Sequence, residues 1–197
     1  MQTMLCAPAA ECDNRGSASA DAKIMPAALP IAAILYTPED NIEALLVRVA
    51  RTLATRGIRL GGVIQHDIAT AINDPCAMEL EDLRNGERFS LSQELGSGSE
   101  ACRLDPAALA HASVSIRAAV EQGAQLVMIN KFGAQEANGD GLRDEMGFAV
   151  LAGTPLLTAV GKRFQPEWEA FTGGDGCLLE PSFDSVIAWW DAQGLAT

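Results

Sequence analysis

The sequence predicts a three-layer α/β domain in which helices cover both faces of a mainly parallel sheet. Short apolar runs without polar alternation, such as IAAILY at 31–36, are typical of strands buried on both faces. Helical patterns alternate with these runs along the chain, and that order favours parallel pairing. With 197 residues, 48% of them hydrophobic, the chain is long enough to bury the core of such a domain.

The first strand–helix–strand unit begins near Leu29. After the strand at 31–36, TPEDN (37–41) supplies residues that start helices. Apolar residues then recur at helical spacing from Ile42, and Gly57 ends the helix. A second apolar run at 58–65 completes the unit, so we expect its two strands to pair in parallel. Residues 1–28, rich in Ala, Ser, Asp and Pro, are expected to be a flexible tail, which leaves 29–197 as one domain.

The middle of the chain predicts a β-hairpin. Residues 77–83 and 88–93 alternate apolar and polar side chains around Asn85-Gly86, a strong hairpin signal because both turn residues tolerate positive φ. We expect this hairpin at the sheet edge or as a flap. A Gly/Ser loop at 94–106 follows and leads into a helix at 107–122.

The last third repeats the alternation of strand and helix. Strands are expected at 125–130 and 154–160, separated by a polar, glycine-rich segment at 131–145 and a helix at 142–152. A short helix, a short strand and a closing helix are expected at the end. The adjacent Trp189 and Trp190 should not both face one core, so we expect one of them to pack on another element or on a second chain.

Composition and charge exclude several classes of function. A formal net charge of −12 disfavours binding to nucleic acid or to anionic membrane surfaces. No apolar run approaches the roughly 20 residues of a membrane span, and no secretory signal is convincing. The cysteines are odd in number and none are in C-x-x-C spacing, so we expect reduced thiols and a cytoplasmic location.

Several segments carry a family resemblance: AAILYTPEDNIEALL, LGGVIQ, MELEDLRNGERFSLSQELG, CRLDPAAL and, most specifically, VMINKFGAQEANGDGLRDEM. From Leu29 onward, the chain resembles a bacterial family of domains of unknown function whose members are often encoded beside molybdate-transport or nitrogen-fixation genes. It is more distantly similar to small P-loop nucleoside-triphosphatases of the archaeal and human type. The resemblance implies a P-loop-NTPase-like fold with an inserted β-hairpin.

The chain departs from that pattern where the phosphates would bind. A working P-loop reads G-x-x-x-x-G-K-[ST], because its glycines let backbone N–H groups surround the phosphates and its lysine neutralises them. Here the turn is YTPEDNIEA, without glycine or lysine and with two carboxylates. Asn130 stands where the Mg²⁺-binding Asp of the later strand would be, and Lys131 replaces the neighbouring acid. These degenerate Walker motifs predict that Mg-NTP hydrolysis is absent.

Ligands of open α/β sheets bind at the carboxyl ends of strands, and polar segments follow three of the predicted strands there. In the segment after the strand at 125–130, Lys131 and Arg143 would face an anionic ligand. The alternative is that this segment is a solvated loop whose glycines only allow the backbone to turn. A surface loop is the simpler role for His66, and one histidine without a second ligand predicts no metal site. The candidates for ligand binding are Thr37, Asn41, Gln65, Cys102, Arg103, Asp105, Asn130, Lys131, Gly133, Glu136 and Arg143.

Cys102-Arg103-Leu104-Asp105 is open to two interpretations. A thiol beside Arg103 and ahead of a helix can have a lowered pKa and act as a soft ligand or nucleophile. Equally, Asp105 is a plain helix cap and Cys102 a small hydrophobic residue.

Three functional hypotheses remain. The leading one is a non-hydrolysing binding protein for a small anionic ligand, either a nucleotide or an oxyanion such as molybdate or tungstate. The molybdenum link rests on the family resemblance alone. The second is an NTPase or nucleotide-dependent enzyme with an atypical site that holds metal through Glu39, Asp40 or Glu136. The third is a dimeric regulatory partner in metal-cofactor supply, which agrees with an expected homo-oligomer.

Overall fold

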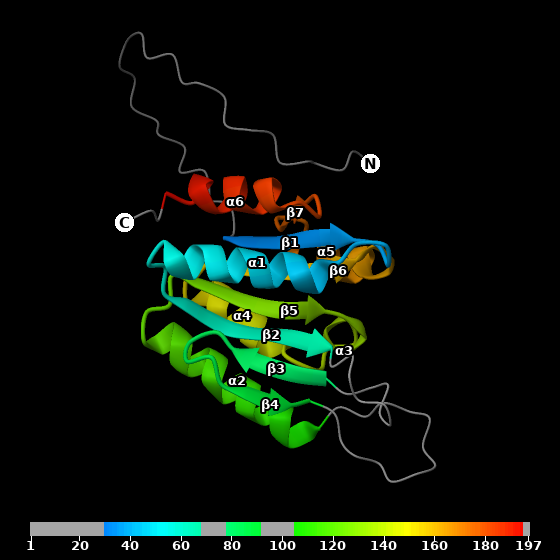
Figure 1. Cartoon of the computed structure of the whole chain (residues 1–197). Helices are drawn as coiled ribbons and strands as arrows, with labels where there is room; N and C mark the ends of the chain where they lie inside the picture. Colours follow the sequence, from blue (N-terminus) through cyan, green and yellow to red (C-terminus); the bar gives the residue numbers. More distant parts are fainter. Residues whose placement is uncertain (1–29, 68–77, 92–104, 195–197) are drawn as a thin grey trace, which may run out of the picture.

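The structure is a computed structural model and describes residues 30–67, 78–91 and 105–194. Its centre is a seven-stranded sheet in the order β4-β3-β2-β5-β6-β1-β7 (Figure 1). The strands β2, β5, β6, β1 and β7 run parallel, and β3 and β4 form an antiparallel hairpin at one edge. The strands are β1 (Ile31–Tyr36), β2 (Leu60–Asp67), β3 (Met78–Asp82), β4 (Arg88–Ser90), β5 (Leu126–Phe132), β6 (Leu156–Gly161) and β7 (Cys177–Leu179).

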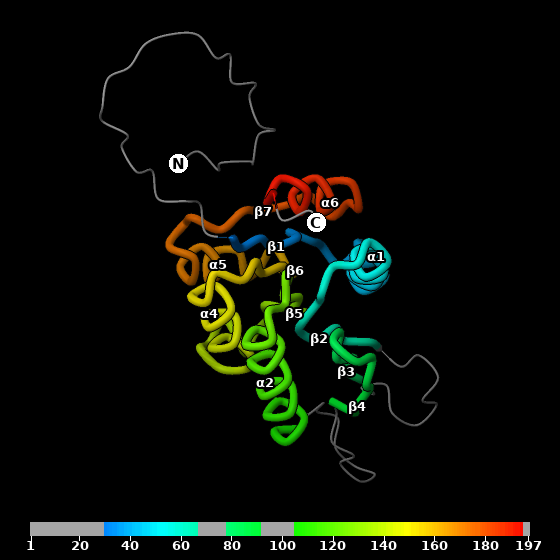
Figure 2. The backbone as a smooth tube through the Cα atoms, turned by 90° about the vertical axis from the view of Figure 1, so that its left-hand side faces the viewer, coloured from blue at the N-terminus to red at the C-terminus, as the bar shows by residue number. Residues whose placement is uncertain are grey.

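Helices cover both faces of the sheet, which confirms the predicted three-layer α/β fold. Figure 2 shows α1 and α6 on one face and α2, α4 and α5 on the other. Two buried cores correspond to these faces: Ala32 and Ile34 of β1 point into one, and Ile31 and Ala33 point into the other. The helices are α1 (Ile42–Thr55), α2 (Pro106–Glu121), α3 (Ala134–Ala137), α4 (Arg143–Leu151), α5 (Gln165–Thr172), α6 (Phe183–Ala192) and a 3₁₀ turn, η1 (Lys162–Phe164).

One predicted pairing is wrong. β1 and β2 run in parallel, but β6 and β5 lie between them in the sheet. A crossover helix fixes the direction of the next strand without fixing how many strands it passes, so the sequence of the first unit could not reveal the insertion. The predicted hairpin does lie at the sheet edge, as expected.

Two glycines, Gly61 and Gly62, follow the first residue of β2, and neighbouring elements pack directly against their backbone. Gly62 has φ +101°, and a Cβ there would lie 1.9 Å from the carbonyl oxygen of Met128 on β5. A Cβ on Gly61 would lie 2.5 Å from Cβ of Ala119 on α2. Only glycine therefore permits this approach of strand and helix.

The expectation for the adjacent tryptophans is also wrong. Trp189 and Trp190 are 9% and 2% exposed and belong to one core, beneath α1 and α6. With Val186 and Ile187 they form a broad apolar face on α6, and a face that wide includes neighbouring positions about 100° apart. Among the described helices, none is long and apolar enough to cross a membrane.

Candidate functional site

The carboxyl ends of the parallel strands meet at one edge of the sheet, at the arrowheads in Figure 1. From β1 the chain passes to α1 on one face, whereas from the neighbouring β6 it passes to α5 on the other. Open α/β sheets bind small ligands where the connections switch faces in this way. The candidate site, called here the carboxyl edge, consists of residues 36–41, 130–133 and 161–163.

The β1–α1 loop is a short turn that uses its own hydrogen-bond donors. The backbone N and the Oγ1 of Thr37 donate to Oδ2 of Asp40 at 2.8 and 2.9 Å, and Asp40 N donates to Thr37 O at 3.0 Å. Asn41 caps α1 by accepting from Ala44 N at 3.0 Å. A phosphate-binding loop instead leaves successive N–H groups free for its ligand. Asp40 therefore occupies a donor pair that an external anion would need.

The negative charges of Glu39 and Asp40 in this loop are stabilised by hydrogen bonds and by a nearby lysine. Hydrogen bonds from the backbone and the hydroxyl of Thr37 lower the pKa of Asp40, and the positive charge of Lys162 lowers it further. The Thr37 hydroxyl also lowers the pKa of Glu39, with Lys162 acting in the same direction. Both carboxylates are therefore ionised at neutral pH.

The end of β6 contributes two cations that were absent from the sequence-based candidates. Lys162 and Arg163 follow Gly161 directly and are exposed in the 3₁₀ turn. Arg163 acts on Tyr36: burial raises the pKa of the phenol, and the guanidinium partly offsets that effect. The sequence did contain a pattern that could have identified them. Gly161-Lys162-Arg163 follows an apolar run that predicts a buried strand, just as Asn130-Lys131 does at the end of β5.

Asn130 and Lys131 lie near the end of β5, at the same edge of the sheet. Leu126 and Met128 pack into the core under α1, so strand alternation places Asn130 on that face. Asn130 is 8% exposed, and its Oδ1 has no hydrogen-bond partner within the described part of the chain. Lys131 is half-buried and forms no ion pair with any described residue. A buried polar atom without a protein partner is typical of a position that meets water or a ligand.

The segment after β5 is held together by Glu136. It contains the short helix α3, where the sequence predicted only a polar loop. Glu136 is buried, and its two carboxylate oxygens accept from Gly133 N at 2.9 Å and from Leu142 N at 3.1 Å. Arg143 donates to the Glu136 carbonyl at 2.8 Å and lies 4.6 Å from the ring centre of Phe171. Glu136 and Arg143 thus shape the loop, and Gly133 lies at its start.

Two sequence candidates sit at β2 and at the start of α2. Gln65 donates to the sulfur of Met78 at 3.2 Å, within the hairpin region. Asp105 caps α2 by accepting from Ala107 N at 2.9 Å, as the simpler interpretation predicted. Cys102 and Arg103 lie outside the described residues. Within the described ranges, no group of three or more His, Cys, Asp or Glu side chains could hold a metal ion.

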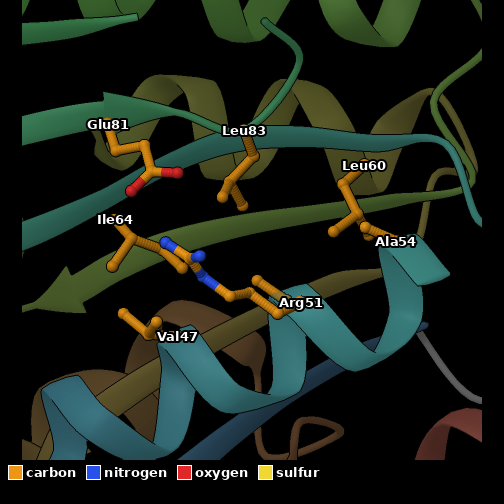
Figure 3. Close-up of a pocket in the computed structure, with 8 residues that line it drawn as sticks. Val47, Arg51, Ala54, Leu60, Ile64, Glu81 and Leu83 are labelled. Carbon is orange, nitrogen blue, oxygen red and sulfur yellow. The ribbon is translucent and has the colours of Figure 1, made fainter. Parts of the chain in front are cut away.

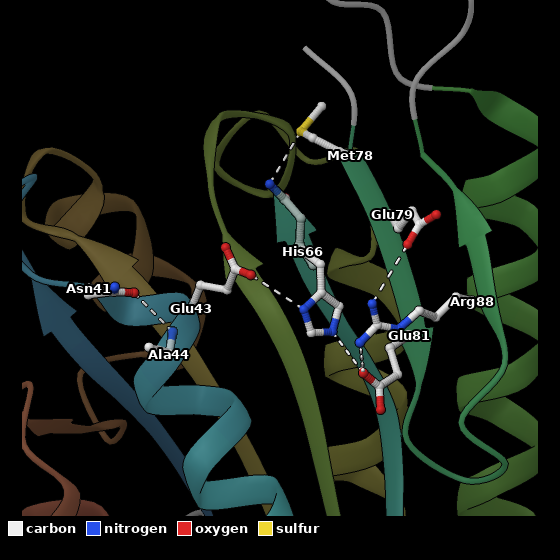
Figure 4. A network of polar contacts seen from close by, with 9 residues as sticks. Asn41, Glu43, Ala44, His66, Met78, Glu79, Glu81 and Arg88 are labelled. Atoms are coloured by element: carbon white, nitrogen blue, oxygen red, sulfur yellow. Dashed lines mark hydrogen bonds and ion pairs between the residues drawn. The ribbon is translucent and has the colours of Figure 1, made fainter. Parts of the chain in front are cut away.

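A polar network joins α1 to the hairpin through His66, which the sequence assigned to a surface loop (Figure 4). The ring is half-buried, with Nδ1 at 3.3 Å from Glu43 Oε1 and Nε2 at 2.8 Å from Glu81 Oε2. Arg88 of β4 donates to the same oxygen of Glu81 at 3.1 Å. His66 thereby links the first turn of α1, next to the carboxyl edge, to both strands of the hairpin.

The carboxyl edge brings together most of the described candidates, but it does not form an open phosphate cradle. Lys131, Lys162 and Arg163 supply positive charge, and the unpaired Oδ1 of Asn130 can accept a hydrogen bond from water or from a donor group of a ligand. The loop that would wrap phosphates is closed by Asp40. Such an arrangement can attract and orient a small anion, but it offers little of the machinery that stabilises a phosphoryl transition state.

Comparison with known proteins gives three similarities. The sequence profile described as "Protein of unknown function (DUF2478)" matches residues 31–189. The molybdenum import ATP-binding protein ModC 2 of Bradyrhizobium diazoefficiens is 44% identical over 160 residues, which cover 81% of this chain but only 18% of that protein. The solution structure of a human cancer-related nucleoside triphosphatase superposes with a TM-score of 0.56 at 16% identity, covering 83% of this chain and 96% of the human one. The last similarity establishes the P-loop-NTPase-like fold and nothing beyond it.

Proposed function

Because the chain belongs to the family described as "Protein of unknown function (DUF2478)", a description that names no activity, we propose a function from the site itself. The carboxyl edge binds a small anionic ligand, either a nucleotide or a metal oxyanion such as molybdate, without hydrolysing it. The observation that carries this proposal is the pairing of Asp40 with both donors of Thr37. The β1–α1 loop uses its hydrogen-bond donors on its own carboxylate, so the chain keeps a nucleotide-hydrolase-like fold without the free donors that would hold the phosphates.

The distribution of lysines supports the anion. The lysines of this chain are Lys23, Lys131 and Lys162. Lys131 lies near the end of β5, and Lys162 directly follows the neighbouring strand β6. Lys131, Lys162 and Arg163 outnumber the two carboxylates of this edge, Glu39 and Asp40, so the edge is locally cationic on a chain of net charge −12. Such a local cationic site concentrates small anions even on an acidic protein.

The relatives suggest which anions to consider. One relative is named as an ATP-binding protein for molybdenum import, so both a nucleotide and molybdate enter as candidates. The matched region is 18% of that protein, so its ATP-binding and import activities are not transferred with the similarity. We propose a role in molybdenum homeostasis for this chain on that basis, with the ligand to be identified by titration.

Calorimetric titration of the full chain with ATP, ADP, GTP, molybdate, tungstate, sulfate and phosphate tests the proposal. We expect one of these anions to bind tighter than millimolar, and we expect Lys162→Ala and Lys131→Ala to weaken it by at least about tenfold. Arg56→Ala is the matched control, because it removes a positive charge at the far end of α1, where Arg56 pairs with Asp191. Millimolar or weaker binding of every anion would refute the proposal, as would steady phosphate release from ATP or GTP.

A further inference from the structure

The face of the sheet that carries α1 is only partly covered. α6 packs on the β1 side of this face and α1 packs against β2, whereas no helix within the described residues covers its β3 edge (Figures 1 and 2). One flank of α1 is closed by α6, with Arg56 paired to Asp191 at 3.0 Å. The other flank, which carries Val47 and Arg51, is open.

An apolar groove runs along this open flank. Its first hollow, of about 180 Å³, lies between α1 and the strands β2 and β3 (Figure 3). A second hollow, of about 380 Å³, shares Ala54, Leu60 and Leu83 with the first and extends to the end of α2. The name α1 groove is used here for the apolar residues Val47, Ala50, Ala54, Leu60, Ile64 and Leu83 with their charged neighbours.

The charged neighbours make the α1 groove basic. Arg51 is exposed and makes no hydrogen bond or ion pair with a described residue, and Arg59 and Arg84 stand at the second hollow. The side chain of Arg59 donates to the Gly123 carbonyl at 3.1 Å, and Arg84 forms an ion pair with Asp82 at 3.7 Å. Glu81 also lines the groove (Figure 3), but its carboxylate is already bound by His66 and Arg88 (Figure 4).

We propose that the α1 groove docks an amphipathic helix of a partner protein, with its apolar stripe on the groove and its carboxylates toward Arg51, Arg59 and Arg84. An apolar floor with a basic border on a chain of net charge −12 is complementary to an acidic, helical partner. A second copy of this chain fits less well, because a two-fold pairing of α1 flanks would bring Arg51 toward its own symmetry mate. In the longer relative the matched region is 18% of the polypeptide, so a domain of this kind does exist joined to other protein segments.

Fluorescence anisotropy with two labelled helical peptides tests this docking on the full chain. Both peptides carry the same leucine stripe; one has glutamates along its edges and the other has lysines. We expect the glutamate peptide to bind at least about tenfold tighter, and Arg51→Glu to remove that preference or reverse it. Arg56→Glu makes the same charge change on the closed flank and should leave the preference intact.

Three outcomes would overturn the proposal. They are equal affinity for the two peptides, an Arg51→Glu variant that keeps the preference, and a self-dimer in sedimentation that Val47→Asp dissociates. Lys162→Ala should leave peptide binding unchanged, since Lys162 lies at the carboxyl edge and not in the groove. The peptide experiment can therefore fail while anion binding succeeds, and the reverse, so the two proposals are tested independently.

Discussion

Thr37 donates both its backbone N–H and its hydroxyl to a single oxygen of Asp40, at 2.8 and 2.9 Å. The two donors converge at the carboxyl end of β1, where a P-loop would present its amides to a phosphate. An aspartate carboxylate and a phosphate oxygen make similar demands on such donors. The loop thus resembles an anion site whose anion is part of the chain.

Removing that internal anion should strengthen the binding of an external one. Asp40→Ala frees the Thr37 donors and deletes a negative charge beside Lys162, so we expect anion affinity to rise at least about fivefold in calorimetry. Asp191→Ala, which deletes an exposed carboxylate near the closed flank of α1, controls for net charge. Equal or weaker binding by the Asp40 variant would show that Asp40 does not compete with the ligand.

Glu136 should matter for stability rather than for chemistry. Glu136→Ala leaves the N–H groups of Gly133 and Leu142 without their shared acceptor, and we expect a loss of about 3 kcal/mol in the free energy of unfolding. Chemical denaturation measures this loss directly. Glu169→Ala, which removes an exposed contact with Gln165, should cost no more than about 0.5 kcal/mol. A stable Glu136→Ala variant that loses ligand binding would instead assign the carboxylate to the site.

His66 should couple the hairpin to α1. Replacing it with alanine removes contacts to Glu43 and Glu81 on two different elements, and we expect a cost of about 1 kcal/mol. Because β3 is held on one side by β2 and on the other only by the short β4, its amides should exchange hydrogen faster in the variant. If hydrogen exchange rose equally across the whole sheet, His66 would not act as a local link between α1 and the hairpin.

The sequence predicted the fold better than it predicted the site, for a physical reason. Local patterns define each element: the apolar run at 31–36 and the Asn85-Gly86 turn both give the observed structure. Sheet order is a long-range property, and nothing local to β1 or β2 indicates that β5 and β6 separate them.

At the carboxyl edge, reasoning from strand ends placed Asn130 and Lys131 among the candidates but was not extended to Lys162, which follows β6 in the same way. Which groups donate to Asp40, and which N–H groups donate to Glu136, depend on side-chain geometry that residue types do not specify.

Tyr36 gives the most direct test, because it is the chain's single tyrosine and stands at the end of β1. Burial raises its pKa above the ordinary value of about 10, and Arg163 partly offsets this, so absorbance titration should show a transition above pH 10. The unfolded chain ionises Tyr36 first, so stability is retained below pH 10 and falls as pH rises toward the folded value. Arg163→Gln should raise the pKa further, and a bound anion should do the same by neutralising Arg163, whereas Arg56→Gln should change nothing. A saturating ligand that leaves the Tyr36 titration unmoved would place the anion away from the β1–β6 switch.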